Sequence, residues 1–204
     1  LLIEKHTEKL ITDDKFVISL GAEHTVTYGF VKAHAKRYDN LTVLQIDAHS
    51  DLRESYQGNP YSHASVMARI HQLGLNICQI GIRAQCKEES QLIKASGNIH
   101  TFYAHHIRKN PDWMSEAISC LTENVYITID ADGFDPSVIP SVGTPEPGGL
   151  YWEETIDFLH MVFSQKNVVG FDVVEMAPRP EDKRSPYNLA KLVYRLIGFA
   201  VQKS

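Results

Sequence analysis

Cysteine is scarce in this chain, and long apolar runs and clusters of basic residues are missing altogether. The 204 residues include three cysteines, Cys78, Cys86 and Cys120. An odd number without a CxxC pair argues against a disulfide framework. Free thiols are typical of a reducing compartment, so we expect a cytoplasmic protein. Residues 1–6 are too short and too charged a stretch for a secretory signal.

The missing apolar and basic runs argue against two kinds of partner. No stretch approaches the roughly 20 apolar residues that a membrane-spanning helix needs. Lys and Arg number 20 against 25 Asp and Glu, so the net charge is −5, and neither nucleic acid nor an anionic membrane is an expected partner. An apolar content of 43% and a charged content of 22% are typical of a globular protein. We therefore expect one domain, 1–204, with a sizeable core.

Short β-rich apolar runs alternate with helical patterns along the chain. This alternation predicts βαβ units and an α/β fold with a mostly parallel sheet between two layers of helices. The strands are nearly continuous in apolar residues, as expected when helices cover both faces of the sheet. The expected strands are 16–20, 41–46, 76–82, 99–103, 125–130 and 168–173. The expected helices are 1–11, 25–38, 63–73, 87–96, 112–121, 152–164 and 187–202.

One long connection, residues 133–150, interrupts the alternation of strands and helices and is rich in proline and glycine. A connection of this length inside a compact domain is usually functional or disordered. Its prolines stiffen the chain, so we interpret it as an ordered rim around a site. The alternative is a passive crossover on the surface.

Six carboxylate and imidazole side chains follow three of the apolar runs, at the point where each run ends. They are His24, Asp47, His49, Asp51, Asp130 and Asp132. In a parallel α/β sheet, ligands bind beyond the carboxyl ends of the strands. Residues i and i+2 of a strand point to one side, so Asp47 and His49 can face one point, and so can Asp130 and Asp132.

This mixture of donors indicates a site for divalent metal ions. Carboxylates with imidazole and without thiolate suit ions such as manganese. Two divalent cations would neutralise the four aspartates, whereas one would leave about half of the charge uncompensated. A pair of ions can share bridging carboxylates and activate a water. A lone DxD is more often a turn or a cap, but DxD and DxHxD behind separate strands of one domain favour a metal-assisted hydrolase.

Four segments together resemble the ureohydrolase family of arginases, agmatinases and formimidoylglutamases. They are Gly21-Ala-Glu-His24, Asp47-Ala-His49-Ser-Asp51, Thr128-Ile-Asp130-Ala-Asp132-Gly-Phe-Asp135-Pro136 and Gly143-Thr-Pro-Glu-Pro-Gly-Gly149. The resemblance extends from about residue 16 to the C-terminus and is greatest to agmatinases. It implies an arginase-like fold, a trimeric or hexameric homo-oligomer and a pair of manganese ions, with cobalt or iron as alternatives. The implied reaction converts agmatine and water to putrescine and urea, within polyamine biosynthesis.

The resemblance also implies a role for each site residue. One ion is held by His24, Asp47, Asp51 and Asp130, and the other by Asp47, His49, Asp130 and Asp132, so that Asp47 and Asp130 bridge. Asp132 accepts a hydrogen bond from the nucleophile and passes its proton toward the leaving amine. His63 relays protons, and Glu175 pairs with the substrate guanidinium. Without the resemblance, His63 reads more readily as a cap and Glu175 as a solvated carboxylate.

The substrate tail is expected to meet residues 52–61, which resemble the agmatinase version of this segment. Arg53 lies in it and could bind a carboxylate through two hydrogen bonds. Agmatine is therefore the expected substrate, with 4-guanidinobutyrate, arginine and formimidoylglutamate as alternatives. A one-zinc amidohydrolase of the deacetylase type and a non-catalytic metal-binding subunit are the alternatives outside the family's chemistry.

The chain departs from the family pattern in two places. Ala22 and Glu23 stand where the family usually has Gly and Asp, so the backbone has less freedom and the carboxylate is longer. We expect this change to affect ligand geometry and rate. The family sheet has eight strands against the six expected here, and the chain begins without Met. We expect the chain to be incomplete at its N-terminus, with an exposed sheet edge there.

Overall fold

Six strands form one wholly parallel sheet in the part of the chain that the computed structural model describes, residues 2–21 and 23–203. Their order across the sheet is β1-β6-β5-β2-β3-β4. The strands are β1 (Val17–Leu20), β2 (Leu41–Ile46), β3 (Asn76–Ile82), β4 (Ile99–Tyr103), β5 (Asn124–Asp130) and β6 (Asn167–Val174). Each predicted strand is correct to within one residue at either end, and the predicted α/β class is confirmed.

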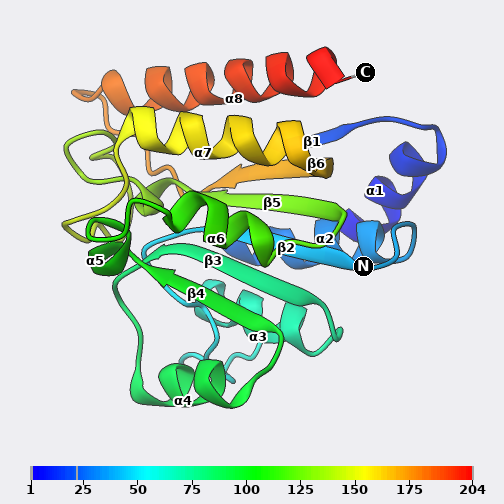
Figure 1. Cartoon of the computed structure of the whole chain (residues 1–204), viewed down its shortest axis with the longest axis horizontal. Coiled ribbons are helices and arrows are strands. Elements are labelled where there is room, and N and C mark those ends of the chain that lie inside the picture. Colours follow the sequence, from blue (N-terminus) through cyan, green and yellow to red (C-terminus); the bar gives the residue numbers. More distant parts are fainter. Residues whose placement is uncertain (1, 22, 204) are drawn as a thin grey trace.

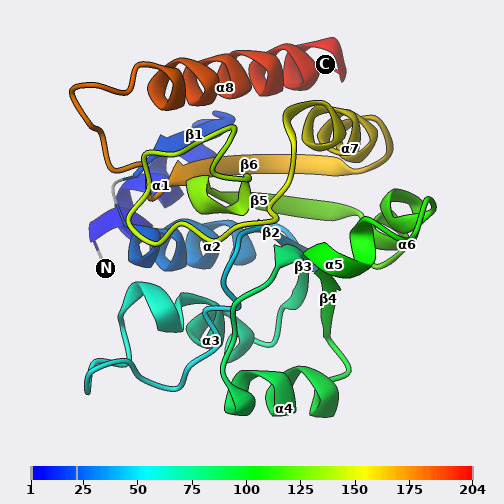
Figure 2. The same ribbon diagram turned by 90° about the vertical axis from the view of Figure 1, so that its left-hand side faces the viewer.

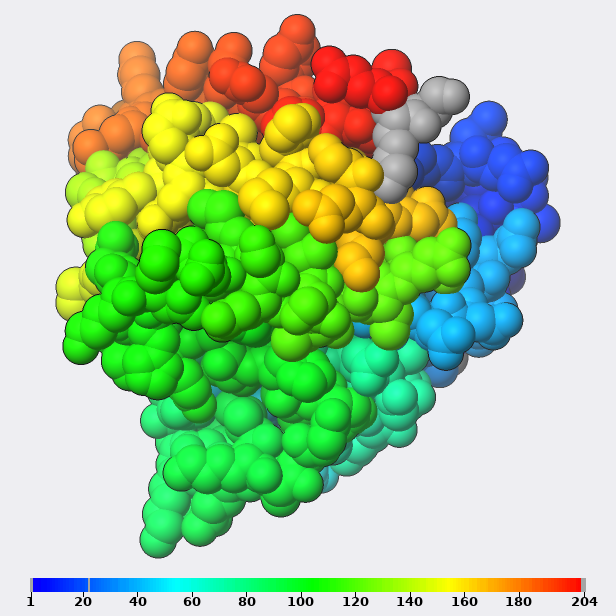
Figure 3. All heavy atoms as spheres, in the orientation of Figure 1, coloured from blue at the N-terminus to red at the C-terminus, as the bar shows by residue number. Residues whose placement is uncertain are grey.

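Helices cover both faces of this sheet and make the fold three-layered (Figures 1 and 2). One face carries α2 (Thr27–Ala35), α3 (Val66–His71) and α4 (Lys87–Ala95), and the other carries α6 (Trp113–Ser119), α7 (Trp152–Gln165) and α8 (Arg184–Lys203). The surface of α7, in yellow, lies between those of α6 and α8 (Figure 3). Two further helices are α1 (Leu2–Thr12), beside α2, and α5 (Ala104–Ile107), after β4.

None of the helices in residues 2–21 and 23–203 combines the length and the apolar character that crossing a bilayer requires.

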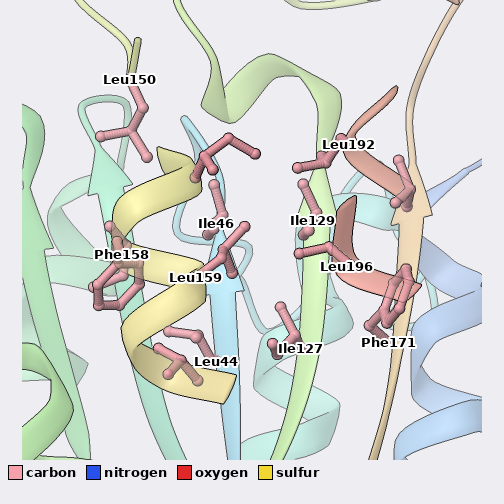
Figure 4. Packing of buried hydrophobic residues seen from close by; sticks show 14 of the residues in the cluster. Leu44, Ile46, Ile127, Ile129, Leu150, Phe158, Leu159, Phe171, Leu192 and Leu196 are labelled. Atoms are coloured by element: carbon pink, nitrogen blue, oxygen red, sulfur yellow. The ribbon is translucent and has the colours of Figure 1, made fainter. Parts of the chain in front are cut away.

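Alternate residues of the central strands pack into two separate cores. In β2, Leu44 and Ile46 pack with the α6, α7 and α8 side, whereas Leu41 and Val43 pack with the α2 and α3 side. This is the period-two alternation of a strand, with both faces buried. Figure 4 shows the first of these cores, where α7 and α8 meet β2 and β5. The sheet is thus a rigid base for the loops that leave its carboxyl edge.

Shortening Leu159 tests the packing of α7 on the sheet. Leu159 is completely buried against the strands, so Leu159→Ala removes apolar contacts and leaves a cavity. We expect the free energy of unfolding to fall by about 2–5 kcal/mol, measured by urea denaturation. Leu2→Ala is the matched control, because Leu2 is 71% exposed and its loss is expected to change stability by less than about 0.5 kcal/mol. A similar loss for both variants would contradict this packing.

Because all strands are parallel, the loops after β1, β2, β5 and β6 leave the sheet at one edge. Three short 3-10 helices lie in these loops: η1 (His24–Val26), η2 (His63–Ser65) and η3 (Ala131–Gly133). The 133–150 connection is ordered, with bridges from Phe134 to Leu150 and from Val142 to Met176. This edge holds the candidate site.

Candidate metal centre

Three aspartates and one histidine from three different loops converge on a buried point. His24 lies in η1, Asp47 and Asp51 follow β2, and Asp130 ends β5. The Nδ1 atom of His24 is 3.0 Å from Asp51 Oδ2, 3.3 Å from Asp47 Oδ2 and 3.4 Å from Asp130 Oδ2. Residues up to 106 positions apart in the chain thus meet at the carboxyl edge of the sheet, as their places after apolar strands predict.

A second group lies next to the first and shares one carboxylate with it. The Nδ1 atom of His49 is 3.1 Å from Asp132 Oδ2 and 3.7 Å from Asp47 Oδ1. Two sets of possible ligand atoms result, each within 4.8 Å: His24, Asp47 and Asp130, and then Asp47, His49 and Asp132. Asp47 belongs to both sets, while Asp130 belongs to the first. The arrangement can accommodate two neighbouring cations with Asp47 between them.

The Nδ1 atom of His24 provides a test of whether a cation fits here. It is buried and makes no hydrogen bond among the described residues, although three carboxylate oxygens lie 3.0–3.4 Å away. A buried polar nitrogen without a hydrogen bond is costly. A cation bound between this nitrogen and the carboxylates satisfies all four groups, so the residues fit a metal ion.

The protonation equilibria of the cluster also indicate a shortage of positive charge. Burial and the charge of Asp47 raise the pKa of Asp51 to about 7. Burial, Asp47 and Asp132 raise the pKa of Asp130 well above its usual range. Burial lowers the pKa of His49, but Asp132 and Asp47 outweigh it and raise that pKa to about 11. Groups that hold protons this strongly indicate a place where divalent cations are favoured instead.

Hydrogen bonds from backbone amides and from one threonine hydroxyl orient the carboxylates. Asp47 Oδ1 accepts from the His49 amide at 2.7 Å, and Asp130 Oδ1 accepts from the Asp132 amide at 2.9 Å. Asp132 Oδ1 accepts from the Ala48 amide at 3.1 Å, and its Oδ2 accepts from the Thr144 hydroxyl at 3.1 Å. Outer contacts of this kind orient metal ligands.

A row of polar side chains crosses all six described strands directly behind the cluster, and sequence reasoning missed it. Its members are register partners from one strand to the next: Ser19, Asp172, Thr128, Gln45, Gln79 and Thr101. We call this set the polar row. Within it, Thr101 donates to Gln79 Oε1 at 2.8 Å, Gln79 Nε2 to Gln45 Oε1 at 2.6 Å and Gln45 Nε2 to Asp47 Oδ2 at 2.7 Å. These three hydrogen bonds lead from the polar row to Asp47, the carboxylate that both donor sets share.

Arg83 is a second residue that the sequence did not reveal. Its guanidinium donates to the carbonyls of Asp132 at 2.7 Å and Glu146 at 2.8 Å. It thereby ties both ends of the 133–150 connection to the end of β3. Gly143 and Thr144 of this connection line the cavity described next, in agreement with the predicted ordered rim.

A cavity of about 630 Å³ opens above the metal cluster, and every predicted site residue except Asp47 lines it. These lining residues are His24, His49, Asp51, Arg53, His63, Asp130, Asp132 and Glu175. Asp47 is completely buried behind them. The cavity is large enough for a small organic substrate.

Glu175 leaves the end of β6 in a left-handed conformation, with φ of 64°. This conformation is uncommon for a residue with a side chain. Its Oε1 accepts from the His24 amide at 2.7 Å, and burial raises the pKa of its carboxyl. Glu175 thus already positions one candidate metal ligand while its carboxylate faces the cavity.

His63 lies at the open side of the cavity, half exposed. Its backbone amide donates to Glu23 Oε1 at 3.0 Å, and its Nδ1 is 3.3 Å from the same oxygen. Thr25 also donates to that oxygen, at 2.6 Å. The longer carboxylate of Glu23 therefore contacts His63. The expected effect of Ala22 concerns a residue outside the described part of the chain.

Arg53 begins the exposed part, 53–59, of the 52–61 segment and lines the cavity. Its guanidinium carbon is 5.7 Å from the centre of the Tyr56 ring, within the range of a cation–π contact. Tyr56 and Asn59 form an isolated bridge, with left-handed φ angles at Gln57 and Gly58 between them. The segment is a tight turn that presents a cation to the mouth.

Comparisons with known proteins agree with this geometry. A sequence profile described as the Arginase family matches residues 1–198. An N(1)-aminopropylagmatine ureohydrolase of Synechocystis is 45% identical over 191 residues, which cover 93% of this chain and 62% of that protein. An agmatinase of Pyrococcus horikoshii is 38% identical over 185 residues, covering 91% and 63% respectively. The chain thus spans less than two thirds of the length of these two relatives.

Solved structures show the same fold. The agmatine ureohydrolase of Thermoplasma volcanium superposes with a TM-score of 0.87 and 32% identity, over 98% of this chain and 67% of that one. An arginase from Bacillus subtilis superposes with a TM-score of 0.86 and 28% identity, over 96% and 76%.

Proposed function

This chain belongs to the arginase family, and on that premise we propose that it provides the catalytic centre of a ureohydrolase that acts on agmatine. Cleavage of the guanidino C–N bond then yields putrescine and urea. N(1)-aminopropylagmatine is a second candidate substrate, because a relative of that name is 45% identical. The observation that carries the proposal is the pair of donor sets that share Asp47, at the base of the cavity that Glu175 lines.

The donor chemistry supports a pair of manganese ions. We propose that one ion is held by His24, Asp47, Asp51 and Asp130 and the other by Asp47, His49, Asp130 and Asp132. The oxygen-rich donors also suit cobalt or iron. When bound, the ions lower the pKa of a water so that it becomes a nucleophile near neutral pH.

The chain's own residues orient the substrate and move its protons. Glu175 pairs its carboxylate with the guanidinium, which holds the carbon in reach of attack. The water oxygen bonds to that carbon, the bond from the carbon to the tail nitrogen breaks, and the tail nitrogen takes a proton. Asp132 accepts the proton of the water and passes it on. His63, half exposed beside the cavity, exchanges protons with solvent and with the amine product.

Urea release from four guanidino compounds tests this function. After manganese loading, we expect kcat/KM for agmatine and N(1)-aminopropylagmatine to exceed that for arginine and 4-guanidinobutyrate by at least about tenfold. The reason is that residues 52–61, which are expected to meet the substrate tail, resemble the agmatinase version of this segment. Equal kcat/KM values for all four compounds would contradict the prediction that the enzyme selects its substrate by the tail.

The Arg53→Ala variant is the control for the cation that Arg53 places at the mouth of the cavity. If Arg53 binds a carboxylate tail, its removal lowers kcat/KM for 4-guanidinobutyrate and leaves agmatine unchanged. Bound manganese without urea from any compound would favour the non-catalytic metal-binding subunit.

We also propose a homo-oligomer and a cytoplasmic location. Tyr187, Tyr194, Ile197 and Val201 form an exposed apolar stripe along α8, which is a common feature of subunit contacts. The three cysteines are free thiols, which suits a reducing compartment. If agmatine is the substrate, as the likeness to agmatinases implies, the putrescine product would make this reaction part of polyamine biosynthesis.

A further inference from the structure

The second ring nitrogen of His24 faces away from the carboxylates, into the polar row. We propose that Thr128 and Asp172 are positioning residues that keep a proton on Nε2 of His24 and thereby leave its Nδ1 to a cation. This inference rests on the proposed metal centre, and it assigns a function to two buried residues that have none in the reaction itself.

The geometry is a continuous chain of hydrogen bonds. The Nε2 atom of His24 is 2.9 Å from the hydroxyl of Thr128, which donates to Asp172 Oδ1 at 2.7 Å. The hydroxyl of Tyr126 donates to Asp172 Oδ2 at 2.8 Å. All four side chains are buried, with at most 1% of each residue exposed.

Which group donates and which accepts in this series of hydrogen bonds follows from the number of hydrogens that each group carries. A threonine hydroxyl has one hydrogen to donate and two lone pairs that accept. Thr128 gives its hydrogen to Asp172, so it can only accept from His24, and Nε2 must carry the proton. The hydroxyl of Thr27 lies 3.3 Å from that of Thr128 and also bonds to Asp172.

This arrangement determines what the other nitrogen can do. Nδ1 lies 3.0–3.4 Å from one oxygen of each of Asp51, Asp47 and Asp130, so a cation bound among these oxygens can take its lone pair. Nε2 keeps its proton when the cation binds, because Thr128 offers it only an acceptor. The ring therefore does not need to change tautomer when metal binds.

A purely structural role explains Asp172 less well. The hydroxyls of Tyr126, Thr128 and Thr27 are the side-chain hydrogen-bond partners that the described structure gives its carboxylate. Burying a carboxylate inside a strand is unfavourable, and an apolar residue would serve packing better. Its register partner Thr128 lies on the neighbouring strand, directly behind His24. The sheet thus aligns the two residues with the ligand.

The inference is tested by measuring the manganese affinity of the wild type and of three variants by calorimetry. Thr128→Val removes the hydroxyl at nearly constant volume, and we expect the dissociation constant for manganese to rise about 10- to 100-fold. Thr128→Ser restores the hydroxyl and is expected to restore the affinity to within about threefold of wild type. Thr42→Val is the matched control, because Thr42 is an equally buried strand threonine whose hydroxyl contacts Thr122. Wild-type affinity in Thr128→Val, or equal losses in Thr42→Val, would overturn the proposal.

Asp172→Asn provides an independent test that does not depend on Thr128→Val folding. The introduced amide can donate to Thr128, which then turns its hydrogen toward His24. We expect the Nε2 proton of His24, observed by NMR in the metal-free wild type, to disappear in this variant, with manganese affinity reduced. An unchanged Nε2 resonance with unchanged affinity would refute the inference. Absence of urea release, with these results intact, would refute the proposed function alone.

Discussion

Replacing Asp132 with Asn is expected to lower kcat for agmatine by about a thousandfold and to reduce the bound manganese from two ions to one per chain. Asp132 Oδ2 is 3.1 Å from His49 Nδ1 and belongs to the donor set that includes Asp47. An amide keeps the shape of the side chain but supplies neither the negative charge nor a base for the proton of the water. Urea release and metal content by mass spectrometry measure the two effects.

Two further variants make this result specific. Asp51→Asn alters the group around His24, and we expect a comparable loss of activity with loss of the other ion. Asp157→Asn makes the same chemical change at an exposed position of α7, and both readouts should stay at wild-type values. Activity close to wild type in Asp132→Asn or Asp51→Asn would instead favour a centre with one metal, of the deacetylase type.

The strands could be predicted closely from the sequence because both faces of the sheet are buried. Each strand is therefore a short run of apolar, often β-branched residues with a sharp beginning and end. Helix boundaries were less accurate. The helix expected over 187–202 begins at Arg184, because Pro186 is tolerated in a first turn. The helix α5, with four residues, is too short to show a periodic pattern, and it was missed.

The candidate site divides into a part that sequence could reveal and a part that it could not. The acidic and histidine residues stand directly after apolar strands, so parallel topology is enough to bring them to one edge. The polar row depends on register between strands that are distant in sequence, such as β5 and β6. Thr128 and Asp172 are therefore neighbours only once the fold is known. Arg83 binds backbone carbonyls, which carry no sequence signal.

Replacing Glu175 with Gln is expected to lower kcat/KM for agmatine by about 10²- to 10³-fold, the equivalent of a lost charge partner in a partly buried site. The variant separates two functions of this side chain. A glutamine oxygen can still accept from the His24 amide, as Glu175 Oε1 does at 2.7 Å. The negative charge that would pair with the guanidinium is lost. We therefore expect manganese affinity to stay within about twofold of wild type while steady-state urea release falls.

Glu175→Ala removes both functions, so it should weaken manganese binding as well as catalysis. The loss of affinity follows because the amide of His24 loses its acceptor and η1 loses its tie to the end of β6. Glu153→Gln, at an exposed position of α7, is the control for charge loss alone and should be neutral. Near-normal kcat/KM in Glu175→Gln would show that another group receives the guanidinium. Weakened manganese binding in that variant would show that its charge, and not its hydrogen bond, supports the metal centre.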